Sequence, residues 1–219
     1  MSIQQMFFSG GAITVPDFIS FGNKLPIYGS NGGSFPPSGW TGLQNSSLDD
    51  ASVGIGLPFT FYIAGSGYTT TYMGSNTYLT FGSGSTNFSG LSASTPALPK
   101  FMFGAADNSY QRVSTITSGT AAYTRIRYEG TATTSGTVGS PNIVLEITLF
   151  NPTNYGGYNV LELLTGVHSR TGGASLVANS STAYATYSQN TLSSYVFVGS
   201  GDGTSWNIFS NYYVNNTDY

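Results

Sequence analysis

The chain has 219 residues, and its six basic and nine acidic side chains give a formal net charge of −3 at pH 7. Charged residues make up 7% of the chain against about a quarter in an average protein, yet 39% hydrophobic and 15% aromatic residues are enough to bury a core. This composition excludes a disordered chain, and the absence of any basic run argues against a nucleic-acid partner.

The chain contains no cysteine, which excludes disulfide bonds and thiolate metal sites. Its first residues lack the basic region and the apolar stretch of a secretion signal, and no run of about 18 apolar residues predicts membrane insertion. A surface rich in Ser, Thr, Asn, Gly and Tyr is nevertheless typical of extracellular proteins, particle-bound proteins and adaptable binding faces. We therefore expect a virion protein that is made in the host cytoplasm and lies on the particle exterior.

Residues 1–50 predict an irregular N-terminal arm, because Gly and Pro interrupt them every few positions, as at 29–33 and 36–39. Two apolar patches lie in this arm, at 6–8 and 18–21. Such patches are usually buried, either on the chain's own core or on a neighbouring subunit. The residues that would dock the arm to a particle or a subunit are Met6, Phe7, Phe8, Phe18 and Phe21.

From residue 51 to 219, short stretches of alternating apolar and polar residues separated by polar turns predict a single β-sandwich domain. Phe59, Phe61 and Ile63 share one face of the first such stretch, which we expect to turn at 65–67. About nine or ten antiparallel strands are expected, with helix limited to a turn or two. The predicted strands cover 59–63, 68–72, 78–81, 101–103, 121–129, 143–150, 160–164, 183–187, 195–198 and 206–209.

Two stretches resemble parts of known phage proteins. The opening Met-Ser-Ile-Gln-Gln-Met-Phe at 1–7 resembles the start of virion and tail-fibre proteins of tailed phages, particularly those that infect marine cyanobacteria. Leu-Pro-Phe-Thr-Phe at 57–61, with the turn at 74–76 and the strand at 78–82, is similar to the opening hairpins of β-sandwich modules in phage structural and bacterial surface proteins. The resemblance implies a phage particle protein. Thr77 stands where Gly usually completes the turn, which predicts a different turn geometry.

A glycan-cleaving site needs two carboxyl groups about 5 to 10 Å apart across a cleft. Glu146 and Glu162 lie inside predicted strands, and pairing of those strands would bring them onto one face with Arg125 or Arg127. A charge-paired cross-strand ladder is favoured over a catalytic dyad. We therefore expect no enzymatic activity, although a glycan depolymerase remains an alternative.

No other residue forms a convincing chemical motif. His168 is the only histidine, and nothing in its spacing supplies the partners of a triad or a metal site. The glycine-rich segments at 82–85 and 199–203 lack the Lys-Ser/Thr of a phosphate loop, and Asp202 alone is too few ligands for calcium. No catalytic, cofactor-binding or metal-binding residue is therefore predicted.

Aromatic residues in or near polar turns are the most suggestive feature for binding. Their rings would stack on sugars while nearby Asn and Ser bind hydroxyls, or they would simply cap the ends of the core. The segment 206–214 offers a third reading, packing on a neighbouring subunit, since interfaces are rich in Trp and Tyr. The candidate contact residues are Tyr155, Tyr158, Tyr184, Tyr187, Trp206, Tyr212 and Tyr213.

These expectations together favour a phage virion structural protein on the particle exterior, within a tail-fibre or host-attachment assembly. Its partners would be other virion proteins, sister subunits in a homo-oligomer and host surface glycan. The alternative reading is a capsid decoration protein that stabilises the head shell.

Overall fold

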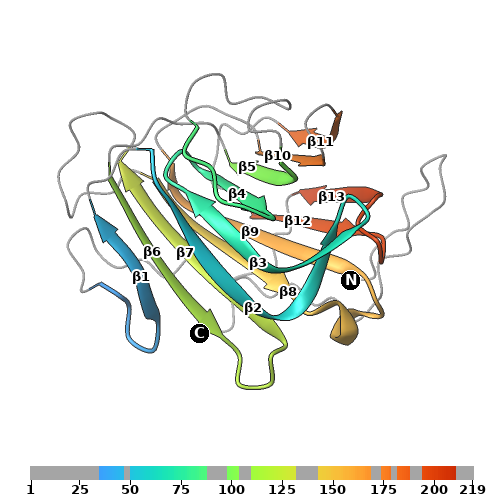
Figure 1. Cartoon of the computed structure of the whole chain (residues 1–219), viewed down its shortest axis with the longest axis horizontal. Coiled ribbons are helices and arrows are strands. Elements are labelled where there is room, and N and C mark those ends of the chain that lie inside the picture. Colours follow the sequence, from blue (N-terminus) through green and yellow to red (C-terminus); the bar gives the residue numbers. More distant parts are fainter. Residues whose placement is uncertain are drawn as a thin grey trace.

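The computed structural model describes residues 35–46, 50–87, 98–103, 110–131, 143–168, 174–178, 182–187 and 194–210. Within these ranges, thirteen strands form two antiparallel sheets that pack face to face (Figure 1), which confirms the predicted β-sandwich. The one helix in the described ranges is the short 3-10 helix η1 (Pro152–Tyr155), in line with the expectation of a helical turn or two.

The two sheets contain seven and six strands. In spatial order, the larger sheet consists of β1 (Thr41–Ser46), β6 (Tyr110–Thr117), β7 (Tyr123–Thr131), β8 (Ile143–Phe150), β9 (Asn159–His168), β12 (Ser194–Gly199) and β13 (Trp206–Ser210). The smaller sheet consists of β11 (Thr182–Tyr187), β10 (Ala174–Ala178), β5 (Lys100–Phe103), β4 (Tyr78–Phe81), β3 (Ser66–Gly74) and β2 (Ser52–Ile63).

Every strand predicted from the sequence is present, and three further strands, β1, β6 and β10, were missed. β1 lies inside the segment expected to be an irregular arm and pairs with β6, so the sandwich begins at Thr41 and not at residue 51. Its sequence, Thr-Gly-Leu-Gln-Asn-Ser, carries no apolar alternation, because an edge strand need not bury one face in the core. The apolar patches of the arm lie outside the described residues.

Alternating apolar side chains of both sheets meet in one core. β2 follows the predicted pattern, with Phe59, Phe61 and Ile63 buried and the residues between them more exposed. Aromatic rings fill the centre of this core. The ring centroid of Phe101 lies 6.0 Å from that of Phe81, 5.5 Å from that of Phe197 and 5.6 Å from that of Trp206, all edge-on, which is a favoured geometry for aromatic pairs.

The turn between β2 and β3 differs from the expected one. Ile63 pairs directly with Ser66, so the turn contains only Ala64 and Gly65, and residues 66 and 67 already belong to β3. Ala64 has φ 55° and Gly65 has φ 76°. Two central residues with positive φ are typical of a type I′ turn, whose twist matches that of the flanking strands.

Thr77 lies in the turn between β3 and β4. Its φ of 62° places it in the left-handed conformation that glycine favours. This conformation destabilises the folded state by about 1 to 3 kcal/mol when the residue is β-branched. The surrounding bonds offset that cost: the Thr77 carbonyl accepts from Phe103 N at 2.9 Å, and the Ser75 carbonyl accepts from the Tyr128 hydroxyl of the other sheet.

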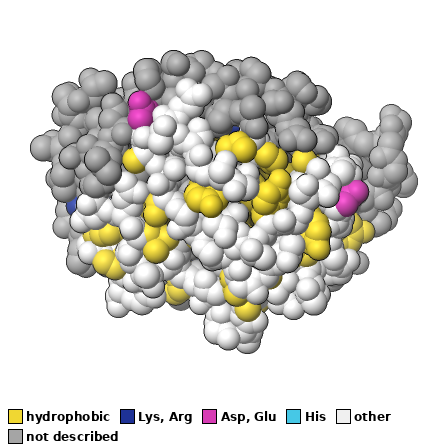
Figure 2. Space-filling model, in the orientation of Figure 1, with side chains coloured by type: hydrophobic (Ala, Val, Ile, Leu, Met, Phe, Trp, Pro, Cys, Tyr) yellow, Lys and Arg dark blue, Asp and Glu magenta, His cyan; other side chains and the backbone are white. Residues whose placement is uncertain are grey.

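The surface seen over the six-stranded sheet carries scattered hydrophobic side chains among uncharged polar ones, with few charged groups (Figure 2). The low charge of the chain is thus visible on this face.

Candidate functional site

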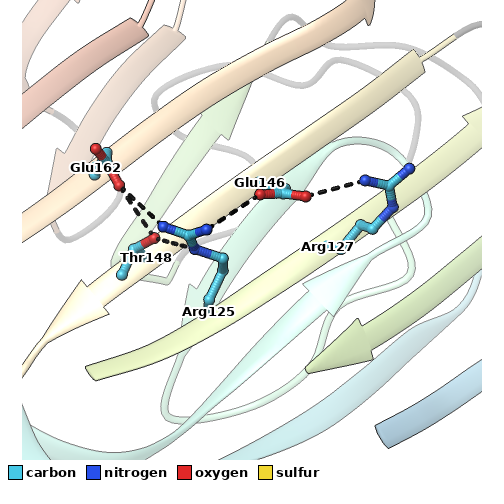
Figure 3. Close-up of polar contacts among 5 residues, drawn as sticks. All are labelled: Arg125, Arg127, Glu146, Thr148 and Glu162. Atoms are coloured by element: carbon cyan, nitrogen blue, oxygen red, sulfur yellow. Dashed lines mark hydrogen bonds and ion pairs between the residues drawn. The ribbon is translucent and has the colours of Figure 1, made fainter. Parts of the chain in front are cut away.

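The seven-stranded sheet carries a connected set of charged side chains on its outer face, which is turned away from the six-stranded sheet (Figure 3). Ile126 and Tyr128 of β7 belong to the core between the sheets. Because side chains alternate along a strand, Arg125, Arg127 and Glu129 point to the opposite face. We call the set the arginine–glutamate array; its members are Arg112, Arg125, Arg127, Glu129, Glu146 and Glu162.

Arg127 makes the closest contacts in the array. Its Nε donates to Glu129 Oε1 at 2.7 Å, and its Nη1 donates to Glu146 Oε1 at 3.0 Å. Glu129 Oε2 in turn lies 3.6 Å from Nη1 of Arg112 on β6. These contacts tie together β6, β7 and β8.

Arg125 continues the array towards β9. Its Nη1 lies 3.6 Å from Glu146 Oε2 and its Nη2 lies 3.7 Å from Glu162 Oε2, so one guanidinium stands between two carboxylates, as Figure 3 shows. Arg125 Nε also donates to the Thr148 hydroxyl at 3.1 Å, and that hydroxyl donates to Glu162 Oε2 at 3.3 Å. The array therefore spans four neighbouring strands.

Strand register places these side chains beside one another. Arg127 lies opposite Glu146, and Thr148 lies opposite both Arg125 and Glu162. All three glutamates of the chain and three of its four arginines belong to the array. The predicted cross-strand ladder of Glu146 and Glu162 with the two arginines of β7 is confirmed.

Arg112 was missed because β6 was not predicted. The signal available in the sequence was the β-branched stretch Val113, Thr115, Ile116 and Thr117, which favours a strand even without regular alternation.

The array is enclosed. Glu146 is fully buried and Arg127 is 2% exposed. An acid–base pair would need a carboxyl group that reaches a substrate, whereas Glu146 and Glu162 share one guanidinium and neither is exposed. Because arginine stays charged in proteins, the ion pairs of the array persist. They can therefore hold the four strands in one register.

A second polar assembly joins three turns at one end of the sandwich, on the right of Figure 1. Ala64 N donates to the Gly203 carbonyl and Gly65 N donates to the Asp202 carbonyl, both at 2.9 Å, so the β2–β3 turn is bonded to the β12–β13 turn. We call residues 62–65, 151–159 and 200–205 the turn cluster.

Asn159, the first residue of β9, connects all three parts of the turn cluster. Its Oδ1 accepts from Tyr62 N at 2.8 Å, while its Nδ2 donates to the carbonyls of Ser200 at 2.6 Å and Gly201 at 3.2 Å. One buried amide thus satisfies backbone groups from both sheets. No sequence pattern pointed to Asn159, because its partners lie 41 to 97 positions away.

Asp202 organises the tip of the β12–β13 turn. Its Oδ1 accepts from the Ser200 hydroxyl at 2.6 Å, from Thr204 N at 3.1 Å and from the Thr204 hydroxyl at 2.8 Å. These hydrogen bonds hold the pKa of the Asp202 carboxyl below its ordinary value. In the described ranges, no group of three or more His, Cys, Asp or Glu side chains is arranged to hold a metal ion.

Tyr155 and Tyr158 belong to the turn cluster and are half-buried. Both pack against a small apolar cluster of Val160, Val196 and Val198, and the Tyr155 ring meets Phe150 edge-on at 5.0 Å. Burial raises the pKa of Tyr155, and the charge of Glu162 raises it further.

Tyr62 was not singled out in the sequence, yet at 37% exposure it is the most exposed described aromatic side chain of the turn cluster.

Trp206 corrects an expectation of surface contact. It is 7% exposed, its ring lies 6.2 Å from Phe61 and 5.6 Å from Phe101 between ring centroids, and its Nε1 donates to the Gly203 carbonyl at 2.7 Å. The ring covers Gly199, where a Cβ would come within 2.7 Å of it. Trp206 is therefore a core residue of β13 and is not available to a glycan or partner.

The other predicted contact residues have no described side chains. Tyr184 and Tyr187 belong to β11 and His168 ends β9, but only their backbone is described. The remaining candidates lie outside the described residues: Met6, Phe7, Phe8, Phe18, Phe21, Tyr212 and Tyr213.

Among the described residues there is no helix of the length and apolar character needed to span a bilayer. No family model, curated protein or solved structure matches this chain.

Proposed function

We propose that this protein is a non-enzymatic structural and binding component of a phage particle, displayed on the exterior within a tail-fibre or host-attachment assembly. The observation that carries the proposal is the use of charge: every glutamate is paired with arginine in a buried array. Most of the charged side chains in the described residues stiffen one sheet, few charged groups lie on the face that Figure 2 shows, and the sequence is rich in Tyr, Asn, Ser, Thr and Gly.

The turn cluster is the end of the sandwich that would meet a host-surface glycan. Tyr62, Tyr155 and Tyr158 present exposed or half-exposed rings among polar turns, and such rings stack on sugar faces. The backbone bonds between the turns keep the rings in place before binding, which lowers the entropic cost of association. Many copies on one particle would then bind through avidity, with each site remaining weak.

Glycan binding is tested with Tyr62→Ala on an array of host-surface polysaccharides. Leu43→Ala is a matched control, because Leu43 is a similarly exposed hydrophobic side chain on β1, outside the turn cluster. We expect Tyr62→Ala to weaken retention of multivalent protein by roughly tenfold, as for the loss of one stacking contact, and the control to bind normally. Equal retention of both variants would contradict this use of the turn cluster.

The absence of catalysis is tested on the same polysaccharides. We expect no release of reducing ends. A release that disappears in Glu162→Gln would instead support the depolymerase alternative, because that carboxylate is one of the two that Arg125 joins.

The position in the particle is tested by immunogold labelling and mass spectrometry of purified phage. Labelling of the tail is expected, whereas hundreds of copies on the head would support the capsid decoration alternative. Removal of residues 1–20 is expected to abolish incorporation, since Met6, Phe7, Phe8 and Phe18 are the predicted docking residues of the arm. Unchanged incorporation would contradict docking through this segment.

A further inference from the structure

The outer face of the seven-stranded sheet changes character at the end of the arginine–glutamate array. On this face, the residue next to Arg125 along β7 is Tyr123, which pairs across the strands with Phe150 of β8. Phe150 takes the same face as Glu146 and Thr148, because side chains alternate along a strand and Leu149 belongs to the core. The charged array therefore gives way to aromatic rings where β8 runs into η1.

Tyr155 of η1 folds back beside these rings. Its ring centroid lies 5.0 Å from that of Phe150, and the Phe150 centroid lies 6.2 Å from that of Tyr123, with both pairs meeting edge-on. Burial raises the pKa of Tyr155, and the charges of Glu162 and Tyr123 raise it further, so the Tyr155 hydroxyl lies near both. We call Tyr123, Phe150 and Tyr155 the aromatic row.

The aromatic row is open to solvent where the array is not. All three of its side chains are half-buried, whereas Glu146 and Arg127 are enclosed. Phe150 and Tyr155 pack on the apolar cluster of Val160, Val196 and Val198, and Tyr158 of the turn cluster packs on the same valines. The row is therefore a firmly supported continuation of the turn cluster onto the sheet face.

The charges around the row favour an uncharged ligand. Glu162 lies next to the row and Asp202 is exposed in the turn cluster, while the Arg125 guanidinium is held between two carboxylates. All basic side chains in the described part of the chain are buried or paired with glutamate: Lys100, Arg112, Arg125 and Arg127. Among the described residues, no exposed cation is present to bind the carboxylate, sulfate or phosphate of an acidic sugar.

A sugar chain also suits the mixed chemistry of this surface. Sugar rings present C–H faces that stack on aromatic rings, and their hydroxyls bind polar groups such as the hydroxyls of Tyr123 and Tyr155. A row of neighbouring rings offers consecutive contacts to consecutive sugars. A protein partner of ordinary affinity would instead need about 800 Å² on each side, which three half-buried rings do not supply.

We propose that the aromatic row extends the glycan site of the turn cluster, and that its ligand is a chain of uncharged sugars running from Tyr158 over Tyr155 and Phe150 to Tyr123. The inference rests on the proposed function, because it names the class of glycan and adds Phe150 and Tyr123 as contact residues.

The class of glycan is tested by surface plasmon resonance on immobilised polysaccharides. The uncharged probes are dextran, mannan and galactan, and the acidic probes are alginate and polygalacturonate. We expect multivalent protein to bind at least one uncharged probe, equally well at low and high salt because no ion pair is screened, and neither acidic probe. Binding to an acidic probe that weakens with salt would overturn the assignment to uncharged sugars. Binding to none of the five would overturn both this inference and the proposed function.

The role of the row is tested with Tyr123→Leu, which keeps an apolar side chain beside Phe150 but removes the flat ring. We expect binding to weaken by roughly tenfold, as for the loss of one stacking contact, and Tyr123→Phe to bind like the unsubstituted protein. Tyr72→Leu is the matched control, because Tyr72 is a half-buried tyrosine on β3 of the other sheet. Binding that is lost in Tyr62→Ala but unchanged in Tyr123→Leu would overturn the extension and leave the proposed function standing.

Two further measurements use the unsubstituted chain and cover a Tyr123→Leu variant that does not fold. In tyrosine nitration followed by mass spectrometry, the polysaccharide that binds should protect Tyr123 and leave Tyr72 reactive; equal nitration of Tyr123 with and without it would contradict the proposal. Sedimentation equilibrium should show the same oligomeric state with and without the polysaccharide. An oligomer that dissociates when the polysaccharide binds would show that the row is an interface between copies, which would also overturn the proposal.

Discussion

The two faces of the seven-stranded sheet are both buried, but by different means. On the inner face, Ile126, Ile147 and Leu163 pack against the other sheet as an ordinary apolar core. On the outer face, their neighbours along the same strands are arginine and glutamate, held in pairs. Apolar packing tolerates substitution as long as volume is kept, whereas a buried ion pair depends on both partners.

The difference bears on the register of the sheet. A shift of β7 by one residue against β8 would place Arg127 opposite an apolar residue of the core face and leave Glu146 without its 3.0 Å contact. Because buried ion pairs contribute little net stability, we interpret the array as a device that selects one register. Each prediction below perturbs one side of this comparison.

The largest effect is expected on the inner face. Phe101→Ala removes a fully buried ring that meets Phe81, Phe197 and Trp206, and should lower the free energy of unfolding by about 3 to 5 kcal/mol. Urea denaturation measures this change. Leu43→Ala on β1 should stay within about 0.5 kcal/mol of the unsubstituted protein. A loss below about 1 kcal/mol in Phe101→Ala would contradict the described core.

On the outer face, the pair should matter more than either member. Arg127→Met alone should cost about 3 kcal/mol, because it leaves Glu146 buried without its closest partner. Adding Glu146→Leu should recover much of that loss, since two apolar side chains can replace a buried pair. A double-mutant cycle by urea denaturation measures the coupling, and strictly additive effects would refute the interpretation of the array as matched pairs.

A smaller effect is expected where a polar group joins both sheets. Asn159→Ala removes the amide that bonds Tyr62 N and the Ser200 carbonyl, and should cost about 2 kcal/mol. Hydrogen exchange should also become faster at Tyr62 than at residues of β8. Asn154→Ala, an exposed position in η1, is the control and should leave both measurements unchanged.

The last effect is a dependence of stability on pH, and it concerns Lys100, whose buried ammonium lies on β5 of the other sheet. Burial lowers its pKa to about 8. Between that value and the ordinary lysine pKa of about 10.4, the unfolded chain binds more protons than the folded one, so stability should rise with pH across this window. Below about pH 8 both states hold the proton and this contribution no longer varies. Urea midpoints from pH 7 to 10.5 measure the rise, which should disappear in Lys100→Met; a rise that persists in the variant has another source.

Much of the sandwich could be predicted from the sequence, because side chains alternate along a strand with a period of two whatever the strand's partners are. The alternation in β7 placed Arg125 and Arg127 on one face, and pairing of β8 with β9 was expected to bring Glu146 and Glu162 onto that face. Edge strand β1 and strand β10 were missed, since neither carries regular alternation of its own.

Tertiary structure alone decided which strands become neighbours, as when β9 pairs with β12 and β5 with β10. It also placed Trp206 in the core and gave Asn159 its partners, because such contacts join positions far apart in the chain and leave no local pattern. The sequence by itself therefore determined which face the side chains take in the strands with regular alternation. Which groups meet across the sheets was set by the packing, because loop closure and shape complementarity depend on the whole fold.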